Sequence, residues 1–94
     1  MSLTPEQRVV VPPDVLINVF DGHAVILNLK SERYFGLDEV GTAMWHALTT
    51  SACVEEAESR LLAEFDVPPE RLHHDLYELA EKLIEHGLLE VQSG

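Results

Sequence analysis

The N-terminal part of the chain carries its apolar positions in short runs of the kind found in β-strands. Residues 15–20 and 24–29 are rich in β-branched and aromatic side chains, and the Asp21-Gly22 pair between them is typical of a tight hairpin turn. A polar turn at residues 30–32 leads into a third run at residues 33–37. The pattern therefore predicts a three-stranded antiparallel meander.

Residues 1–13, which precede this meander, are expected to form a partly ordered N-terminal arm. Its valine run, Val9 to Val11 after Arg8, can form a strand. The Pro12-Pro13 pair would end that strand, because proline has no N–H group to donate to a sheet. The sequence assigns the arm no role.

From Asp38 onward the apolar positions recur at helical spacing. Asp38 is a candidate N-cap for a first helix that runs to about Thr49. A second helix is predicted from Val54 to Phe65. The apolar positions expected to face the core are Val40, Ala43, Met44, Ala47 and Leu48 with Trp45 alongside in the first helix, and Ala57, Leu61, Leu62 and Phe65 in the second.

The third predicted helix begins at Pro69 and ends at Gly87, since proline suits a first helical turn and glycine suits the residue that terminates a helix. Residues 88–91 form a short extended exit. The apolar side of this helix spans roughly 160° of its circumference, wider than the ~100° that one core contact requires. Either both edges of the apolar arc pack within a small core, or one edge faces something else. The arc consists of Leu72, His73, Leu76, Tyr77, Leu79, Ala80, Leu83 and Ile84.

Three strands followed by three helices indicate an α+β class, winged helix-turn-helix-like domain. With 94 residues, the chain is long enough for one hydrophobic core and too short for a second. We therefore expect residues 1–94 to form a single domain. Such a fold does not by itself fix a function.

The charge of the chain narrows the class of its partners. Asp and Glu outnumber Lys and Arg by 17 to 6, which gives a formal net charge of −11. A nucleic acid would be repelled, because its affinity for proteins rests largely on neutralising phosphates with Lys and Arg. A peptide that carries Lys or Arg would be attracted. The acidic residues on the second and third helices are expected to form solvated faces.

No constellation of catalytic or metal-binding residues can be assembled from the sequence. The five histidines are scattered, and the adjacent His73 and His74 point about 100° apart on a helix, unlike metal ligands spaced i and i+4. His86 is expected to interact with the C-terminal dipole of the third helix. Cys53 has no basic neighbour in sequence to activate it and is expected to be a buried or half-buried small residue. We therefore predict a non-enzymatic protein without cofactor or metal.

The location suggested by the sequence is the cytoplasm. A single cysteine excludes an intrachain disulfide and is compatible with a reducing compartment. The longest apolar runs fall far short of a membrane span, and no secretory signal pattern begins the chain. We expect no membrane partner.

The strand at residues 33–37 is an exposed edge of the predicted meander. It contains no proline, Arg33 is its only charge, and Gly36 has no side chain to keep another backbone away. An edge with so little protection is suited to strand addition by a peptide. The sequence therefore favours a binding domain over an enzyme.

A set of short motifs resembles the PqqD-like peptide-recognition domains, over roughly residues 14–91. The elements that carry the resemblance are Leu27-Asn28-Leu29, Tyr34-Phe35-Gly36-Leu37-Asp38, Gly41, Met44-Trp45, Leu48, Leu62-Ala63-Glu64-Phe65-Asp66-Val67, Asp75-Leu76 and Leu83-Ile84-Glu85-His86-Gly87-Leu88-Leu89. Their order and spacing are similar to the stand-alone members found with lasso-peptide clusters. The chain departs from the family at Asn28, where members often carry Asp, and in the Thr49-Thr50-Ser51 turn, where members often carry Gly.

The resemblance implies that the domain binds the leader segment of a ribosomally made precursor peptide. The leader would add as a strand beside residues 33–37 and against the third helix, and a leader peptidase and a cyclase would act on the captured precursor. The sequence does not decide which edge of the third helix faces this groove. The candidate peptide-binding residues are Arg33, Tyr34, Phe35, Gly36, Leu37, Asp75, Leu76, Glu78, Leu79, Ala80, Lys82 and Leu83.

Two other functions remain open at this point. A DNA-binding winged helix would use the third helix for recognition, although its acidic residues outnumber Arg71 and Lys82. A dimerisation module would instead pair the open edge at residues 33–37 with its own copy.

Overall fold

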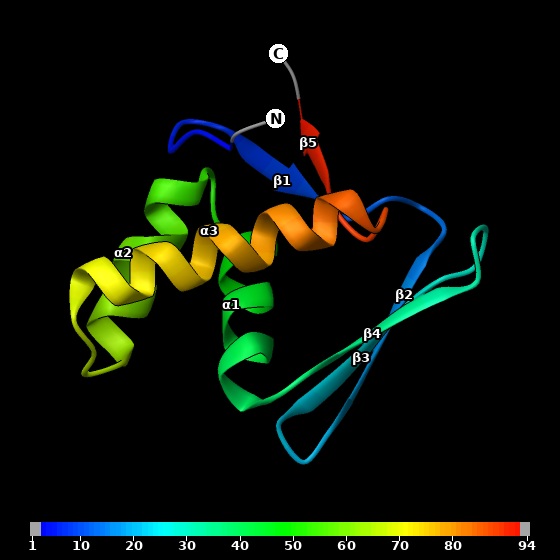
Figure 1. The fold of residues 1–94 in the computed structure, drawn as a ribbon, viewed down its shortest axis with the longest axis horizontal. Helices are drawn as coiled ribbons and strands as arrows, with labels where there is room; N and C mark the ends of the chain where they lie inside the picture. The colour runs from blue at the N-terminus through cyan, green and yellow to red at the C-terminus, as the bar shows by residue number, and fades with distance from the viewer. Residues whose placement is uncertain (1–2, 93–94) are drawn as a thin grey trace.

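The computed structural model describes residues 3–92, in which three helices pack with two small antiparallel sheets (Figure 1). The α+β class and the order of a three-stranded sheet followed by three helices are confirmed. In chain order the elements are β1 (Arg8–Val10), β2 (Val15–Phe20), β3 (His23–Asn28), β4 (Arg33–Leu37), α1 (Glu39–Thr50), α2 (Val54–Glu64), α3 (Pro69–Glu85) and β5 (Glu90–Gln92).

The predicted meander is present with strand order β2-β3-β4. Asp21 and Gly22 both adopt positive φ angles, 49° and 80°, as a tight hairpin turn of the predicted kind requires. The register pairs Phe20 with His23, so β3 begins one residue earlier than the apolar pattern indicated. It also ends one residue earlier, at Asn28.

The helix ends follow local signals in the sequence. The Asp38 side chain caps α1 by accepting a hydrogen bond of 2.8 Å from the backbone N–H of Gly41. A Cβ atom at Gly41 would lie 3.2 Å from the Leu37 side chain, so a larger residue there would have to displace that side chain slightly. Gly87 has a φ of 73° just after α3 and terminates that helix as predicted.

The N-terminal arm has a structural role that its sequence did not reveal. Strand β1 pairs antiparallel with β5, so the two ends of the described chain form a second sheet. Val9 is buried in the core, and the backbone N–H of Val54 donates a 2.9 Å hydrogen bond to the carbonyl oxygen of Gln7. The arm therefore satisfies an N–H group at the start of α2, where the N-cap residue Cys53 makes no side-chain cap. Cys53 is half-buried, as expected.

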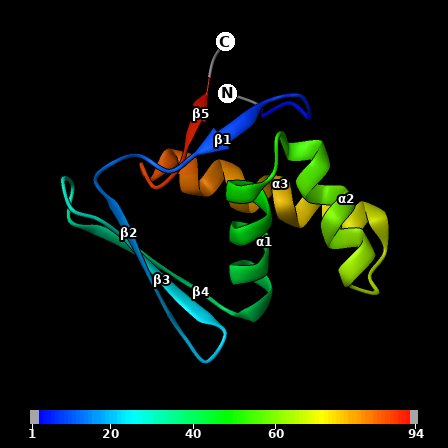
Figure 2. The same ribbon diagram turned by 180° about the vertical axis from the view of Figure 1, so that it is seen from behind.

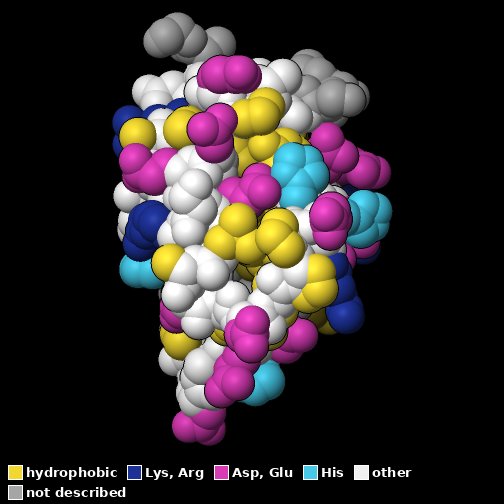
Figure 3. Space-filling view, turned by 90° about the vertical axis from the view of Figure 1, so that its left-hand side faces the viewer, with side chains coloured by type: hydrophobic (Ala, Val, Ile, Leu, Met, Phe, Trp, Pro, Cys, Tyr) yellow, Lys and Arg dark blue, Asp and Glu magenta, His cyan; other side chains and the backbone are white. Residues whose placement is uncertain are grey.

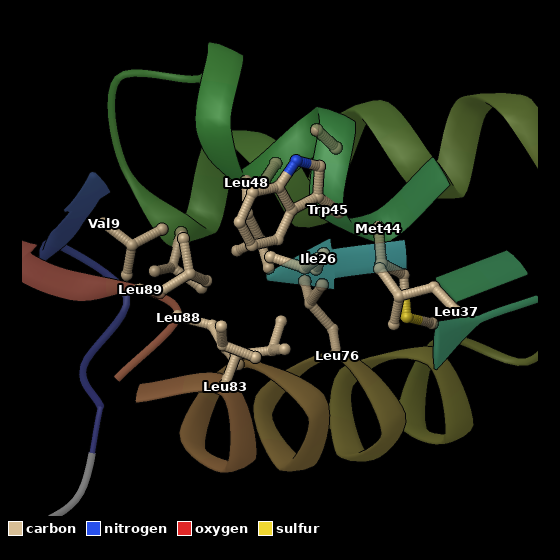
Figure 4. Packing of buried hydrophobic residues seen from close by; sticks show 14 of the residues in the cluster. Val9, Ile26, Leu37, Met44, Trp45, Leu48, Leu76, Leu83, Leu88 and Leu89 are labelled. Carbon is tan, nitrogen blue, oxygen red and sulfur yellow. The ribbon is translucent and has the colours of Figure 1, made fainter. Parts of the chain in front are cut away.

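The core lies where α1, α3, β3 and the segment before β5 meet. Ile26, Trp45 and Leu76 converge at its centre, and Leu83 and Leu88 extend it toward the second sheet (Figure 4). The exit at residues 88–91, predicted only as extended, thus begins with buried residues.

One helix position differs from the predicted core stripe. Val40, in the first turn of α1, is 47% exposed, whereas Met44 one turn later is buried. Val40 instead lines a surface hollow, which is described below.

Candidate functional site

Strand β4 forms one outer edge of the meander sheet. Its inner side pairs with β3, and the N-terminal arm pairs with β5 instead. Figures 1 and 2 show β1 and β5 on the opposite side of α3 from β4. Among residues 3–92, no strand therefore covers the outer side of β4.

The register identifies which backbone groups of β4 face outward. The N–H of Leu29 donates to the carbonyl oxygen of Asp14, so the odd-numbered residues at this end of β3 direct their backbone groups toward β2. The even-numbered residues of β3 then bond to β4, where their partners are Arg33, Phe35 and Leu37. The N–H and C=O groups of Tyr34 and Gly36 consequently point to the open edge.

The side chains of β4 alternate between the core and the outer face of the sheet. Leu37 is buried, and Phe35 is half-buried against the core. Tyr34 is 73% exposed on the outer face. A Cβ atom added to Gly36 would meet nothing within 4 Å, so another backbone has room to approach this part of the edge.

One flank of α3 contacts β4 at the C-terminal end of the helix. The Phe35 ring makes an edge-to-face contact with His86, with ring centroids 5.9 Å apart. Steps of three or four residues from His86 lead along a single stripe of the helix. This α3 stripe consists of Leu72, Asp75, Leu79, Lys82 and His86, and the Phe35–His86 contact places its C-terminal end beside β4.

A hollow of about 250 Å³ lies at the N-terminal end of the α3 stripe. Its wall is mostly apolar. The Arg71 Nε and Asp75 Oδ2 atoms lie 3.8 Å apart, and both side chains are substantially exposed. The hollow is therefore suited to an apolar side chain that enters past a pair of charges. The lining residues are Val40, Met44, Phe65, Val67, Arg71, Leu72 and Asp75.

The structure brings together part of the predicted residue set and separates the rest. Asp75, Leu79 and Lys82 lie on the α3 stripe that flanks β4. Glu78 lies toward solvent, where its carboxylate is 3.2 Å from His74. Three other members belong to the hydrophobic core with 0% exposure and support the stripe from beneath: Leu76, Ala80 and Leu83.

The sequence interpretation missed the hollow. Val40 and Phe65 were assigned to core stripes, and Val67 was named only within a motif that carries the family resemblance. Their apolar character was the only signal that the sequence offered. It was insufficient because the hollow combines residues from α1, α3 and the loop between α2 and α3.

Asn28 anchors the turn before β4 to the end of α3. Its Nδ2 donates a 2.7 Å hydrogen bond to the carbonyl oxygen of Gly87. Its Oδ1 accepts from the backbone N–H groups of Lys30 at 2.9 Å and Ser31 at 3.1 Å. An aspartate could accept the two turn bonds but could not donate to Gly87. This one side chain therefore sets the start of β4 relative to α3.

The face of the molecule formed by α2 and the start of α3 is mainly acidic (Figure 3). Figure 3, seen from the side on which α2 and the start of α3 lie, shows many Asp and Glu side chains and few Lys or Arg around a central group of hydrophobic side chains. Such a surface attracts cationic groups and repels phosphates.

The opposite flank of α3 packs against α2 and carries its own polar cluster. His73 Nδ1 lies 2.9 Å from Glu58 Oε1, and the His73 ring stacks on Tyr77 with centroids 4.2 Å apart. Burial, with a smaller contribution from the nearby Glu58 carboxylate, raises the pKa of Tyr77 above its usual value. His86 Nδ1 lies 2.9 Å from the Lys82 carbonyl oxygen, as expected for a residue that interacts with the end of α3.

Within residues 3–92, no group of three or more His, Cys, Asp and Glu side chains is arranged to hold a metal ion. No helix in the same range combines the length and apolar content needed to cross a bilayer.

Comparison with known proteins gives three similarities. A family model described as coenzyme PQQ synthesis protein D (PqqD) matches residues 23–89. A solved chain described as "TbiB1 in Complex with the TbiA(beta) Leader Peptide" is 30% identical, with a TM-score of 0.79 over 89% of this chain and 98% of that one. Another, "Lasso peptide synthetase B1 complexed with the leader peptide", shares the fold at 21% identity, with a TM-score of 0.75 over 90% of this chain and 98% of that one. No curated protein matches.

Proposed function

The chain belongs to the PqqD family, and on that premise we propose that it binds the leader segment of a ribosomally synthesised precursor peptide. A protein 30% identical to it has been solved with a leader peptide. The leader would add to the outer edge of β4 as a further strand. The domain itself would carry out no reaction.

The observation that carries this proposal is the unpaired edge of β4 beside the α3 stripe. Tyr34 and Gly36 offer two N–H donors and two C=O acceptors at this edge, by the register of β3 and β4. Each main-chain hydrogen bond contributes roughly 0.5–1.5 kcal/mol net. Because backbone groups are common to all residues, these bonds supply affinity that tolerates many leader sequences.

Side chains would supply the selectivity. Leu79 and the Phe35 ring give the strand an apolar floor, and the hollow at Val40 and Leu72 accepts one apolar leader side chain. Asp75 and Lys82 lie on the same stripe and can pair with polar groups of the leader. Arg33 and Leu37 mark the two ends of the paired segment.

Enzyme partners follow from the same proposal. By holding the leader, the domain would raise the effective concentration of the precursor at a leader peptidase and at a cyclase of the pathway. The net charge of −11 disfavours the alternative of DNA binding, since groove entry requires a positive surface.

The test is a calorimetric titration with a synthetic peptide that carries the leader of a precursor encoded beside the gene. Leu79→Asp, which places a carboxylate on the α3 stripe, is expected to weaken binding at least about tenfold, because a buried unpaired charge costs more than 1.4 kcal/mol. Leu62→Asp is the matched control, since Leu62 is a half-buried leucine on α2 outside the site. Equal affinity in both variants and the parent chain would refute the proposed groove.

A further inference from the structure

Strand β2 is the second outer edge of the meander, and its side chains are unusually exposed. The strand carries no charged residue and no proline. Four of its six residues are large hydrophobics that are substantially exposed: Leu16 at 54%, Ile17 at 41%, Val19 at 56% and Phe20 at 60%. Natural edge strands usually carry a charge, a proline or a cover that prevents pairing. An uncovered edge of this kind indicates an interface.

The backbone of β2 is ready to pair. Its even-numbered residues bond to β3, since Phe20 and His23 flank the two-residue hairpin turn. Its odd-numbered residues therefore point outward. The Val15 N–H already donates to the Pro12 carbonyl oxygen, which leaves Ile17 and Val19 as the free part of the edge.

The sequence of β2 is complementary to itself under a two-fold axis. An antiparallel pair centred on Asn18 places Leu16 opposite Phe20 of the second copy, and Ile17 opposite Val19 of the second copy. In this register the outward-facing backbone groups of Ile17 and Val19 in one copy lie opposite those of Val19 and Ile17 in the second copy, as an antiparallel ladder requires. Asn18 is the only polar residue of β2. The Asn18 side chains of the two copies lie opposite each other at the centre of the pair, where their amides can hydrogen-bond to each other.

The charge distribution also favours contact between two copies through this edge rather than through another surface of the molecule. The chain has a net charge of −11, so most faces of two copies repel. Residues 14–37, which contain the whole meander, hold three acidic residues against two basic ones. In the Asn18-centred register, Asp21 lies opposite Val15 of the second copy and no two carboxylates face each other.

From these observations we propose that the protein forms a two-fold dimer through β2. The two meanders join into one six-stranded sheet with the order β4-β3-β2-β2-β3-β4. Both β4 edges lie at the outer rims of this sheet and stay free. The dimer is therefore distinct from one formed through β4, with which a bound peptide would compete.

Sedimentation velocity over a range of protein concentrations tests the dimer. Val19→Lys is expected to raise the dimer dissociation constant at least about tenfold, because it places an ammonium group opposite Ile17 twice per dimer. Val25→Lys is the matched control, since Val25 is 41% exposed on the central strand β3 and lies away from the edge. Added salt is expected to strengthen the parent dimer by screening the repulsion between acidic copies.

Cysteine cross-linking tests the register, in a chain whose Cys53 is replaced by alanine. Asn18→Cys is expected to form a disulfide-linked dimer under mild oxidation, because opposed residues at a non-hydrogen-bonded site have Cα atoms about 4.5 Å apart, within disulfide range. Leu16→Cys is the control, since Leu16 faces Phe20 of the second copy. A monomer at all concentrations, equal weakening by the two lysine variants, or equal cross-linking by the two cysteine variants would overturn the proposal.

Discussion

Replacing Gly36 by proline separates the backbone contribution of β4 from its side chains. The N–H of Gly36 points to the open edge, so proline removes no hydrogen bond within the sheet. Space is available, because a Cβ atom there would meet nothing within 4 Å. The left-handed glycines among the described residues are Gly22 and Gly87, so no positive φ opposes the proline. Proline is tolerated on an edge strand when its N–H side faces solvent.

The expected loss in leader affinity can be worked out from the four backbone groups that Tyr34 and Gly36 present. Proline removes one donor, and its ring obstructs the approach of the adjacent leader backbone, which disrupts a second bond. At about 0.5–1.5 kcal/mol per bond, the loss is about 1–3 kcal/mol. This corresponds to a rise in the dissociation constant of about 5- to 150-fold.

Calorimetric titration with the synthetic leader peptide measures this change, and thermal unfolding verifies that Gly36→Pro leaves the fold intact. Ile17→Pro is the matched control, because Ile17 also directs its N–H outward but lies on the opposite edge of the sheet. It is expected to leave leader affinity unchanged. Unaltered affinity in Gly36→Pro, or an equal loss in the two variants, would refute strand addition at β4.

Three further predictions concern stability and are checked by denaturant or thermal unfolding. Asn28→Asp should destabilise the fold by about 1–2 kcal/mol, because aspartate cannot donate to the Gly87 carbonyl oxygen, and unchanged stability would show that this bond contributes nothing. Leu76→Ala should cost about 2–5 kcal/mol, as Leu76 of α3 is fully buried and points toward Ile26 (Figure 4), and unchanged stability would contradict this core packing. The raised pKa of Tyr77 means that the unfolded chain loses its phenolic proton first, so stability should fall as pH rises above about 10, and Tyr77→Phe should reduce that fall.

Features set by local signals could be predicted from the sequence. The Asp21-Gly22 turn, the Asp38 cap and the Gly87 terminus each depend on a few adjacent residues, and each lies where the sequence placed it. The bounds of β4, which the site requires, were also predicted correctly because a turn and a helix cap delimit it.

Features set by tertiary contacts could not be predicted in this way. The pairing of β1 with β5 joins the two ends of the described chain, and no local pattern encodes it. The flank of α3 that faces β4 depends on the bond between Asn28 and Gly87 and on the contact between Phe35 and His86. Leu76, Ala80 and Leu83 were therefore grouped with Leu79 as candidate contacts, although the structure places them in the core.

The two open edges of the meander differ in what lies beside them, and that difference assigns them different proposed partners. Strand β4 has the α3 stripe and the hollow at its side, so a strand added there meets pockets that can select among side chains. Strand β2 packs on β3 and has large exposed side chains on both faces, with no helix among residues 3–92 making an extensive contact with it. A hollow of about 250 Å³ with a mostly apolar wall lies on the faces of β2 and β3. An identical strand brings the matching apolar residues with it, so β2 is suited to a second copy and β4 to a leader.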